Sequence, residues 1–240
     1  MFDPRLPRGG DQQIPRPAGF AVSRRAPWLT ADEAGPHARR WDVESVLDVV
    51  RGVEPSPARI WHEELDLRPA AVLCGITETD AGASVILTKR GSRMRTHRGE
   101  ISFPGGKLDE GESVIEAALR ESHEEIGLEP HLVTPIGQLN HVSTVVSTSY
   151  IVPIVARVDP HAHLSPMTGE VEKVLYVPVS ELLHPEAFHE ERWDLPNATI
   201  HVVFFEIPGE TIYGATARML FHLSALLTGT VEQLESNPGD

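Results

Sequence analysis

Only one cysteine occurs among the 240 residues, so no internal disulfide bond can form. That residue, Cys74, lies in the apolar stretch AAVLCGI, where we expect a buried structural thiol rather than a nucleophile or a metal ligand. No stretch approaches the roughly 20 apolar residues of a membrane span, and the N-terminus lacks the apolar region of a secretory signal. We therefore expect a cytoplasmic protein that does not enter a membrane.

Basic residues are scarce: 21 Lys and Arg stand against 35 Asp and Glu, which gives a formal net charge of -14. Sequence-independent binding to nucleic acid or to an anionic membrane relies on Lys and Arg that neutralise phosphates. The composition therefore argues against nucleic acid and membrane as partners. With 40% hydrophobic residues, the chain is long enough to bury the core of one domain plus an extension.

The start of the chain differs in composition from the rest. Its Pro, Gly and Arg content predicts poor order up to about Arg25. Apolar residues then recur at helical spacing from Trp41 to Arg51, which predicts an amphipathic helix packed on the main domain. Two prolines between Val53 and Arg59 mark a boundary. The expected division is an N-terminal extension, a main domain and a C-terminal tail: residues 1–64, 65–229 and 230–240.

Beyond this boundary the pattern becomes typical of strands. Apolar, β-branched runs separated by turn-forming residues predict strands at Ala70–Ile76, Ser84–Leu87, Val133–Leu139, Thr144–Val146, Tyr150–Val158, Val174–Val177 and Ile200–Phe205. The segment TETDAGA between the first two suits a hairpin, and the apolar run Ala215–Gly229 predicts a final helix. The expected fold class is α/β, a mixed β-sheet layered with α-helices.

The segment Gly106–Leu128, GKLDEGESVIEAALRESHEEIGL, predicts a loop, a helix and a second loop. Ser113 followed by Glu116 forms a capping box that begins the helix, and Gly127 suits the left-handed residue that ends it. At about 100° per residue, the side that faces the core is expected to consist of Ile115, Ala118, Leu119, Ser122 and Ile126.

Another side of this helix gathers like charges. Glu121, Glu124 and Glu125 fall within an arc of about 100°, with Arg120 beside them. Carboxylates at this spacing weaken a helix, and their place near its C-terminus opposes the macrodipole. A divalent cation reverses both effects, and Mg²⁺ prefers hard oxygen ligands. The alternative is a solvated acidic face.

The tract before the helix, ILTKRGSRMRTHRGEISFPGG from Ile86 to Gly106, is basic within an acidic chain. Arginine suits phosphate because its planar guanidinium makes bidentate, charge-assisted hydrogen bonds. We therefore expect an anionic ligand here. The alternative is a surface loop whose arginines only balance nearby glutamates.

Both tracts resemble signatures of a known family. The order Gly106, Glu112, Arg120-Glu121, Glu124-Glu125 and Gly127-Leu128 resembles the Nudix box of hydrolases that cleave nucleoside diphosphates linked to a second group. The preceding tract resembles the additional motif of the coenzyme A pyrophosphatase branch, at Ile86, Leu87, Thr88, Arg90, Arg95, Gly99, Phe103, Pro104, Gly105 and Gly106. Departures are Ile86 in place of Leu, Gly91 in place of Ser or Ala, and Ser122 where an apolar residue is common. The similarity covers roughly residues 65–227.

This resemblance implies a pyrophosphohydrolase that uses Mg²⁺ or Mn²⁺. Its expected catalytic residues are Arg120, Glu121, Glu124 and Glu125, and its expected metal ligands are Glu121, Glu124, Glu125 and the Gly106 carbonyl. Its expected substrate-binding residues are Arg90, Arg95 and Phe103, and Phe103 is expected either to support the loop or to contact an apolar part of the substrate. The general base stays open between Glu124 and two residues outside the box, Glu170 and Glu172. Glu112 is expected to support the loop rather than to bind the metal.

The implied substrate is coenzyme A or an acyl derivative, cut to adenosine 3′,5′-bisphosphate and (acyl-)4′-phosphopantetheine. Hydrolysis of NADH, ADP-ribose or a nucleoside triphosphate is the alternative within the family. A third reading is a Nudix module that binds a nucleotide without turnover. The retained carboxylates of the helix argue against that reading. The sequence leaves a homodimer open.

Overall fold

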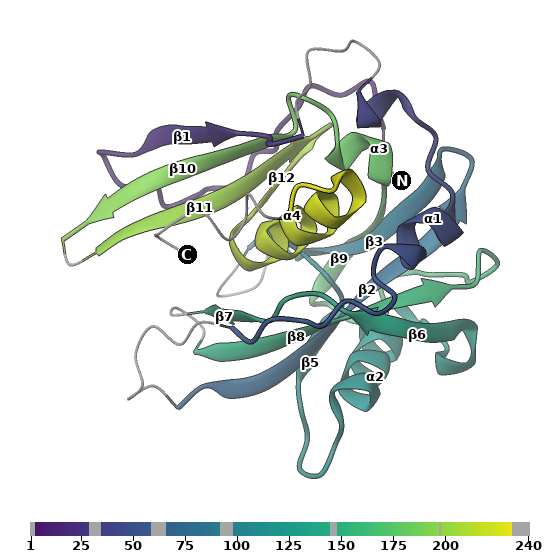
Figure 1. The fold of residues 1–240 in the computed structure, drawn as a ribbon. Helices are drawn as coiled ribbons and strands as arrows, with labels where there is room; N and C mark the ends of the chain where they lie inside the picture. The colour runs from purple at the N-terminus through teal and green to yellow at the C-terminus, as the bar shows by residue number, and fades with distance from the viewer. Residues whose placement is uncertain are drawn as a thin grey trace.

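Two β-sheets organise the chain in the computed structural model, which describes residues 3–28, 35–58, 66–91, 98–144, 148–196 and 198–231 (Figure 1). The larger sheet contains β2 (Arg68–Thr79), β3 (Gly82–Arg90), β4 (Ile101–Ser102), β5 (Gly105–Lys107), β6 (Val133–Gln138), β7 (Val142–Thr144), β8 (Ser149–Val158) and β9 (Val171–Pro178). The smaller sheet contains β1 (Ala21–Arg25), β10 (Phe188–Leu195), β11 (Ala198–Ile207) and β12 (Glu210–Tyr213). The helices are α1 (Val43–Asp48), α2 (Val114–Ile126), α3 (Val179–Leu182) and α4 (Gly214–Thr228), with short 3₁₀ turns at η1 (Pro36–Ala38) and η2 (Pro130–Leu132).

The larger sheet is mixed, as the sequence predicts. Its strands follow the order β4-β3-β2-β8-β6, while β5 pairs with β2, β7 with β8 and β9 with β3. β2 and β8 run parallel, whereas the other pairs are antiparallel. The β2–β3 hairpin closes at the pair Thr79 and Gly82, inside the predicted turn. Gly82 has φ 97°, and a Cβ there would lie 2.5 Å from the Trp41 carbonyl oxygen, so the turn requires glycine.

The helices divide the hydrophobic interior into two cores. α4 lies between the two sheets in Figure 1, where its apolar side chains pack with those of β11, β12 and the larger sheet. α2 covers the opposite face of the larger sheet, with Ala117, Ala118 and Ile126 against Ala71 and Ile154. The larger sheet is therefore buried on both faces, which accounts for the near-continuous apolar character of β2 and β3.

Most predicted elements are present, with shifted ends. β2, β3, β6, β8, β9, β11 and α4 each overlap a predicted segment. β7 ends at Thr144, where a strand was expected to begin, and residues 145 and 146 lie outside the described ranges. The amphipathic helix is shorter than predicted because it begins after Asp42, whose carboxylate accepts a hydrogen bond from the Ser45 N–H at 2.9 Å.

Two expectations from composition concern burial and membranes. Cys74 is fully buried, as expected, and burial raises the pKa of its thiol, which disfavours the reactive thiolate. Within the ranges that the structure describes, no helix is both long enough and apolar enough to cross a membrane.

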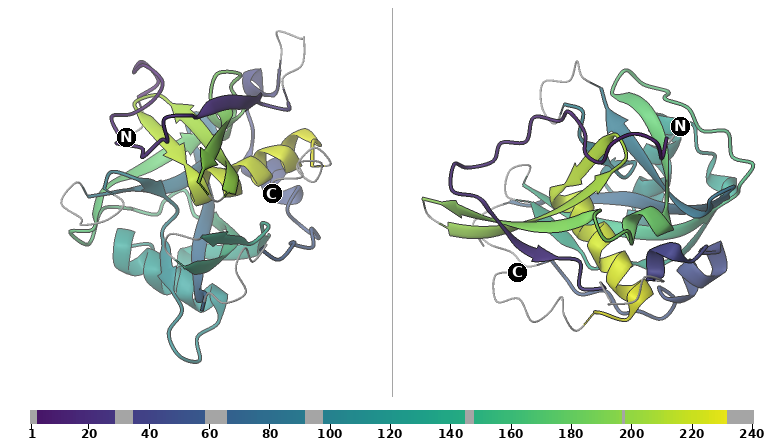
Figure 2. Two further views of the ribbon diagram at one scale, coloured as in Figure 1. Left: turned by 90° about the vertical axis from the view of Figure 1, so that its left-hand side faces the viewer. Right: turned by 90° about the horizontal axis from the view of Figure 1, so that it is seen from above.

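The predicted disorder before Arg25 is wrong for the described residues 3–25. β1 pairs with β10, and the Gly9 N–H donates to the Ile207 carbonyl at 3.0 Å. The purple N-terminal segment runs along the smaller sheet in Figure 2. The Arg16 guanidinium pairs at 2.9 Å with Glu191, whose side chain is 3% exposed. A buried carboxylate needs a cation or hydrogen-bond donors. Arg16, which belongs to the segment whose composition suggested disorder, supplies this cation to β10. The division at residue 64 stays a prediction.

Burial of His222 on α4 predicts a pH-dependent stability. The Asn140 N–H donates to His222 Nδ1 at 2.9 Å, and burial lowers the pKa of this imidazole from 6.5 to about 4. Because the unfolded chain takes up this proton at a higher pH, the stabilisation is present above about pH 6.5 and is lost as the pH falls towards 4. We expect the free energy of unfolding in urea to fall by about 2 kcal/mol more in the parent than in His222→Gln between pH 7 and pH 5. Equal losses in the two proteins would contradict this role.

Candidate active site

Helix α2 begins and ends as its sequence predicts. The Glu116 N–H donates to Ser113 Oγ at 3.3 Å, and the Ser113 N–H donates to the Glu116 carboxylate at 2.9 Å. Gly127 has φ 70° and donates its N–H to the His123 carbonyl at 2.9 Å. Both ends are therefore set by local interactions, which fixes the rotation of the carboxylates around the helix axis.

The predicted core face of α2 is correct except near its start. Ala118, Ser122 and Ile126 are buried and Leu119 is partly buried, but Ile115 is 39% exposed. Ala117 is buried in its place. The helix therefore rests on the sheet through two small alanines, which turns Ile115 outward and brings the backbone of α2 close to the sheet.

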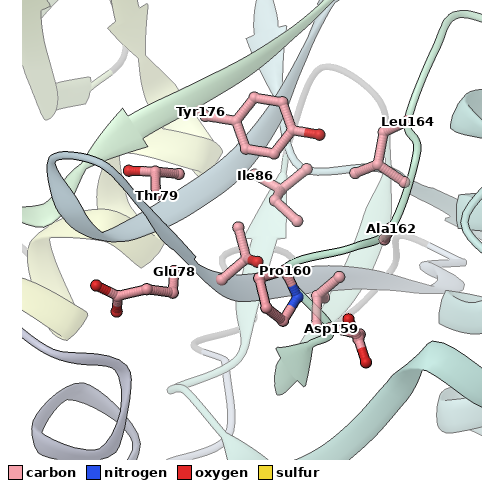
Figure 3. A pocket seen from close by; sticks show the side chains of 10 residues that line it. Glu78, Thr79, Ile86, Asp159, Pro160, Ala162, Leu164 and Tyr176 are labelled. Carbon is pink, nitrogen blue, oxygen red and sulfur yellow. The ribbon is translucent and has the colours of Figure 1, made fainter.

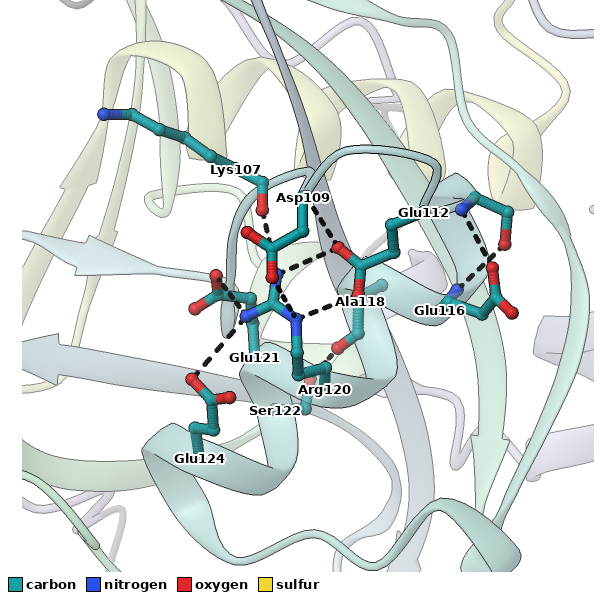
Figure 4. Close-up of polar contacts among 10 residues, drawn as sticks. Lys107, Asp109, Glu112, Glu116, Ala118, Arg120, Glu121, Ser122 and Glu124 are labelled. Carbon is teal, nitrogen blue, oxygen red and sulfur yellow. Dashed lines mark hydrogen bonds and ion pairs between the residues drawn. The ribbon is translucent and has the colours of Figure 1, made fainter.

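Arg120 organises the acidic residues around it (Figure 4). Its Nε and Nη2 donate to the two oxygens of Glu112 at 2.9 and 3.0 Å, and Nη1 donates to Glu121 Oε1 at 2.9 Å. Nη2 also donates to the Lys107 carbonyl at 3.0 Å. The hydrogen bond to Glu112 is the main reason that the pKa of Arg120 is raised, and the pKa of the Glu112 carboxyl is lowered in turn. Glu112 thus supports the loop, because it also accepts the Asp109 N–H at 2.9 Å.

Glu121 lies against the backbone of the loop before α2. A Cβ built on Gly106 would lie 2.5 Å from the Glu121 carboxyl carbon, a separation that real Cβ atoms do not show. The side chain of Glu121 is 21% exposed. Glycine at position 106 is therefore required for the carboxylate and the main chain to share this space.

Glu125 is the most desolvated carboxyl group of the predicted site. Burial raises its pKa to about 7, the hydrogen bond from the Gly105 N–H at 3.3 Å opposes this, and the charge of Glu121 adds to it. Gly105 has φ 149°, and a Cβ there would lie 2.4 Å from the Ala71 carbonyl oxygen. Glycine is again required, here so that the Gly105 amide can face Glu125.

Arg90 and Glu170 reach the same region from β3 and from the loop before β9. Arg90 Nη2 lies 3.3 Å from Glu170 Oε2, and the Gly91 N–H donates to the Glu170 carbonyl at 2.7 Å. The charge of Arg90 lowers the pKa of Glu125 and that of Glu170 raises it, so both lie within electrostatic reach of α2.

The loop that carries Glu170 also completes the end of α2. The Met167 N–H donates to the Glu125 carbonyl at 2.9 Å, and the Ser165 N–H donates to the Ile126 carbonyl at 3.1 Å. These bonds satisfy carbonyls that a helix C-terminus leaves without partners. Glu170 is therefore tied to α2 through the backbone, and sequence reading could not find these amides because they carry no side-chain signal.

The other predicted site residues are placed differently. Burial lowers the pKa of Lys89, the hydrogen bond and charge of Glu210 raise it, and the charge of Glu172 adds a smaller contribution. The charge that raises the pKa of Glu125 from this loop is that of Glu170. Glu124 is 55% exposed, 3.6 Å from Arg120 Nη1. Phe103 is 2% exposed within the core between the sheets, so of its two expected roles only support of the loop fits this structure. Arg95 lies outside the described residues. The Gly105 amide and the Lys107 carbonyl, which both contact the site, were not predicted.

The described cavities lie elsewhere. One of about 170 Å³ is formed by the far ends of β2, β3, β8 and β9 with residues 159–164, and Figure 3 shows Tyr176, Ile86 and Leu164 around it. Another, of about 710 Å³, lies between the N-terminal segment and the smaller sheet. Neither is lined by Glu121, Glu124 or Glu125, so chemistry rather than cavity size identifies the candidate site.

The residues present fit a cation that keeps part of its shell for water and substrate. No group of three His, Cys, Asp or Glu side chains among the described residues is arranged to hold a metal ion alone. Glu121 and Glu125 nevertheless meet the main chain of Gly105 and Gly106, and burial disfavours the charge of Glu125. Mg²⁺ commonly takes one or two carboxylates and several waters or phosphate oxygens. The three-carboxylate ligand set stays a prediction.

A mixed α/β fold that sets two glycines of a strand against a helix carrying an arginine and several glutamates defines a class of acidic sites suited to divalent cations and phosphate groups. A family model described as NUDIX domain matches residues 66–197, more than half of the chain. The chain belongs to the Nudix family.

Related proteins agree with this assignment. The uncharacterized Nudix hydrolase NudL of Enterobacter sp. (strain 638) is 39% identical over 129 residues, which is 53% of this chain and 66% of the relative. NudL of Photorhabdus laumondii subsp. laumondii is 33% identical over 172 residues, 71% of this chain and 89% of the relative. Nudix hydrolase 3 of Caenorhabditis elegans is 38% identical over 47% of this chain and 48% of its own. The chain thus spans just under two thirds of the Enterobacter relative and about half of the C. elegans one.

Solved structures with a similar fold share less sequence. A Nudix hydrolase from M. smegmatis, RenU, has a TM-score of 0.42 and 23% identity over 56% of this chain and 86% of its own. A C. elegans Ap4A hydrolase binary complex has a TM-score of 0.41 and 17% identity over 48% of this chain and 82% of its own. Neither structure adds to what the related sequences show about the family.

The space beside Gly106 predicts the effect of one methyl group. In Gly106→Ala the new Cβ must displace the Glu121 carboxylate, 2.5 Å away, from the main chain. We expect the dissociation constant for Mn²⁺, measured by calorimetry, to rise at least about tenfold, a loss of about 1.4 kcal/mol. Gly19→Ala is the matched control because nothing lies within 4 Å of its added Cβ. Equal Mn²⁺ affinity in the two variants would show that Gly106 does not contribute to a metal site.

Proposed function

We propose that this protein hydrolyses the pyrophosphate bond of coenzyme A or acyl-coenzyme A, with Mg²⁺ or Mn²⁺, to adenosine 3′,5′-bisphosphate and (acyl-)4′-phosphopantetheine. The observation that carries the chemistry is the meeting of Glu121 and Glu125 with the main chain of Gly105 and Gly106. The choice of substrate rests on the tract from Ile86 to Gly106, which resembles the coenzyme A pyrophosphatase motif. In the described part of that tract, Arg90 stands beside the acidic residues.

Each residue of the site has a separate task in this proposal. Glu121 and Glu125, with the Gly106 carbonyl, hold the cation, which when bound polarises the pyrophosphate and lowers the pKa of water. Arg120 fixes the direction of Glu121 through a 2.9 Å hydrogen bond while Glu112 and the Lys107 carbonyl hold Arg120 in place. This arrangement sets the carboxylates before substrate arrives, so little reorganisation is needed.

Arg90 is suited to a substrate phosphate. Its side chain is 27% exposed, and its buried Nε has no hydrogen-bond partner among the residues that the structure describes. A buried donor without a partner is costly, and a phosphate oxygen is a strong acceptor for a guanidinium. We propose that Arg90 donates to the phosphate next to the cleaved bond.

Glu170 is the better placed of the two outer candidates for the general base. It stands beside Arg90 and within electrostatic reach of Glu125, whereas Glu172 acts on Lys89. Its side chain is 55% exposed, so a water molecule can approach it. Glu124, equally exposed on α2, stays the alternative inside the box. A carboxylate in either place can take the proton of the attacking water.

The substrate is tested by a panel. The purified protein is incubated with coenzyme A, NADH, ADP-ribose and 8-oxo-dGTP, each with Mg²⁺ or Mn²⁺, and the products are separated by chromatography. Release of adenosine 3′,5′-bisphosphate at the highest kcat/KM supports the proposal. Preference for another compound keeps pyrophosphate hydrolysis and rejects the assignment to coenzyme A. Binding without any product would indicate a module without turnover.

Removing one carboxylate charge tests the chemistry. Glu121→Gln keeps the volume of the side chain, and we expect kcat to fall by about 100-fold or more because a metal ligand contributes several kcal/mol of charge stabilisation. The matched control is Glu129→Gln, just beyond α2, where the carboxylate is 54% exposed and pairs with His123 at 3.4 Å. Metal catalysis through Glu121 is rejected if the two variants retain the same kcat.

Replacing Arg90 tests phosphate binding. In Arg90→Met the aliphatic stem stays and the charged hydrogen bonds are lost, so we expect KM for the preferred substrate to rise about tenfold, equivalent to 1.4 kcal/mol. Arg40→Met is the matched control because Arg40 pairs with Glu78 on the surface, near the hairpin end of β2. An unchanged KM in Arg90→Met would exclude contact between Arg90 and the substrate.

A further inference from the structure

Glu210 is a buried carboxylate that the proposed chemistry does not use. It is the first residue of β12, and its side chain is 7% exposed. Lys89 Nζ lies 2.8 and 3.1 Å from its two oxygens, Gln12 Nε2 donates to it at 3.0 Å, and Lys173 Nζ lies 3.6 Å away. A buried charge with this many partners is stabilised, and each partner is in turn held in place.

The two lysines belong to paired strands of the larger sheet. Lys89 on β3 faces Lys173 on β9 directly across the antiparallel ladder. Like charges in this position repel each other. The Glu210 carboxylate lies near both lysines. It therefore offsets their repulsion and links β3, β9 and β12. We name the group Glu210, Lys89 and Lys173 the Glu210 clamp.

The residues next to the clamp belong to the candidate active site. Arg90 follows Lys89 on β3, and Glu170 immediately precedes β9. Successive residues of a strand point to opposite faces, so Lys89 points to the smaller sheet while Arg90 points to the side of α2. The ladder register shifts between Lys89 and Arg90, so side-chain contacts must supply some of the order that regular pairing supplies elsewhere.

We infer that Glu210 is a positioning residue for the active site: it holds the ends of β3 and β9 together and so places Arg90 and Glu170 beside α2. This inference rests on the proposed function. Gln12 extends the clamp to the N-terminal segment, because its Nε2 donates to Glu210 and its Oε1 accepts the Thr211 N–H at 3.2 Å. Residues on both sides of the span that matches the family model therefore support the site.

The test compares two buried glutamates of the smaller sheet. Glu210→Gln removes the charge that separates Lys89 from Lys173. Glu191→Gln is the matched control, because Glu191 is 3% exposed, pairs with Arg16 at 2.9 Å and lies on β10, which pairs with neither β3 nor β9. For each full-length variant, kcat, KM, the Mn²⁺ dissociation constant and amide hydrogen exchange are measured.

We expect Glu210→Gln to lower kcat/KM at least about tenfold and to speed exchange at residues 88–91 and 171–174 about tenfold. Exchange in α2 and Mn²⁺ affinity should stay within about twofold, because the clamp does not touch Glu121 or Glu125. Glu191→Gln should leave all of these measurements within about twofold of the parent.

Two results overturn the inference. One is equal behaviour of the two variants in kinetics and exchange. The other is faster exchange throughout Glu210→Gln, including α2, which assigns Glu210 to general stability. If the parent turns over none of the four compounds, the proposed function fails by itself. The exchange comparison at residues 88–91 and 171–174 then decides whether the clamp orders the strand ends.

Discussion

Strand β5 lies close against α2 at Gly106 because glycine has no side chain. Gly106 brings its backbone to a distance from the Glu121 carboxylate at which a Cβ has no room. The same approach lets the Lys107 carbonyl meet Arg120 and the Gly105 amide meet Glu125. Small buried alanines on the other side of α2 keep the helix close to the sheet. The site therefore depends on dense packing between these two elements as much as on its charged groups.

Acidic residues outnumber basic ones in this chain, so a single cation can contact several carboxylates. Arg120 lies within 4 Å of Asp109, Glu112, Glu121 and Glu124, so one guanidinium contacts four carboxylates of this loop and helix. In the smaller sheet, Arg16 and the Trp193 indole N–H both bind Glu191. Because Arg120 has several acidic partners, its loss would leave more than one carboxylate uncompensated. A net charge of -14 is therefore compatible with ordered acidic clusters.

Local sequence signals predicted the helix of the site well. The capping box at Ser113 and the left-handed Gly127 depend only on neighbouring residues, and both are present in the structure. The apolar runs that became β2, β3 and β8 are buried on both faces, so their composition alone identified them. The α/β class followed from these elements.

Long-range partners could not be read in the same way. β10, FHEERWDL, looks like a charged surface segment in the sequence. Its Glu191 is nevertheless buried, because Arg16, 175 positions away, pairs with it. The N-terminal segment looked disordered because its own partners, such as Glu191 and Thr211, also lie far away in the sequence. Likewise, the charge of Glu170 acts on Glu125, whereas that of Glu172 contributes to the raised pKa of Lys89. No local pattern in the sequence distinguishes these two glutamates.

The crossing of the N-terminal segment over the smaller sheet also constrains the order of folding. Arg16 and Glu191 are 175 positions apart, and Gly10 bonds to Thr211 across 201 positions. These contacts close very long loops, and loop closure costs entropy before any contact can repay it. During synthesis the segment leaves the ribosome well before the strands that it binds. The N-terminal segment must therefore wait for β10 to β12 before it can find its place.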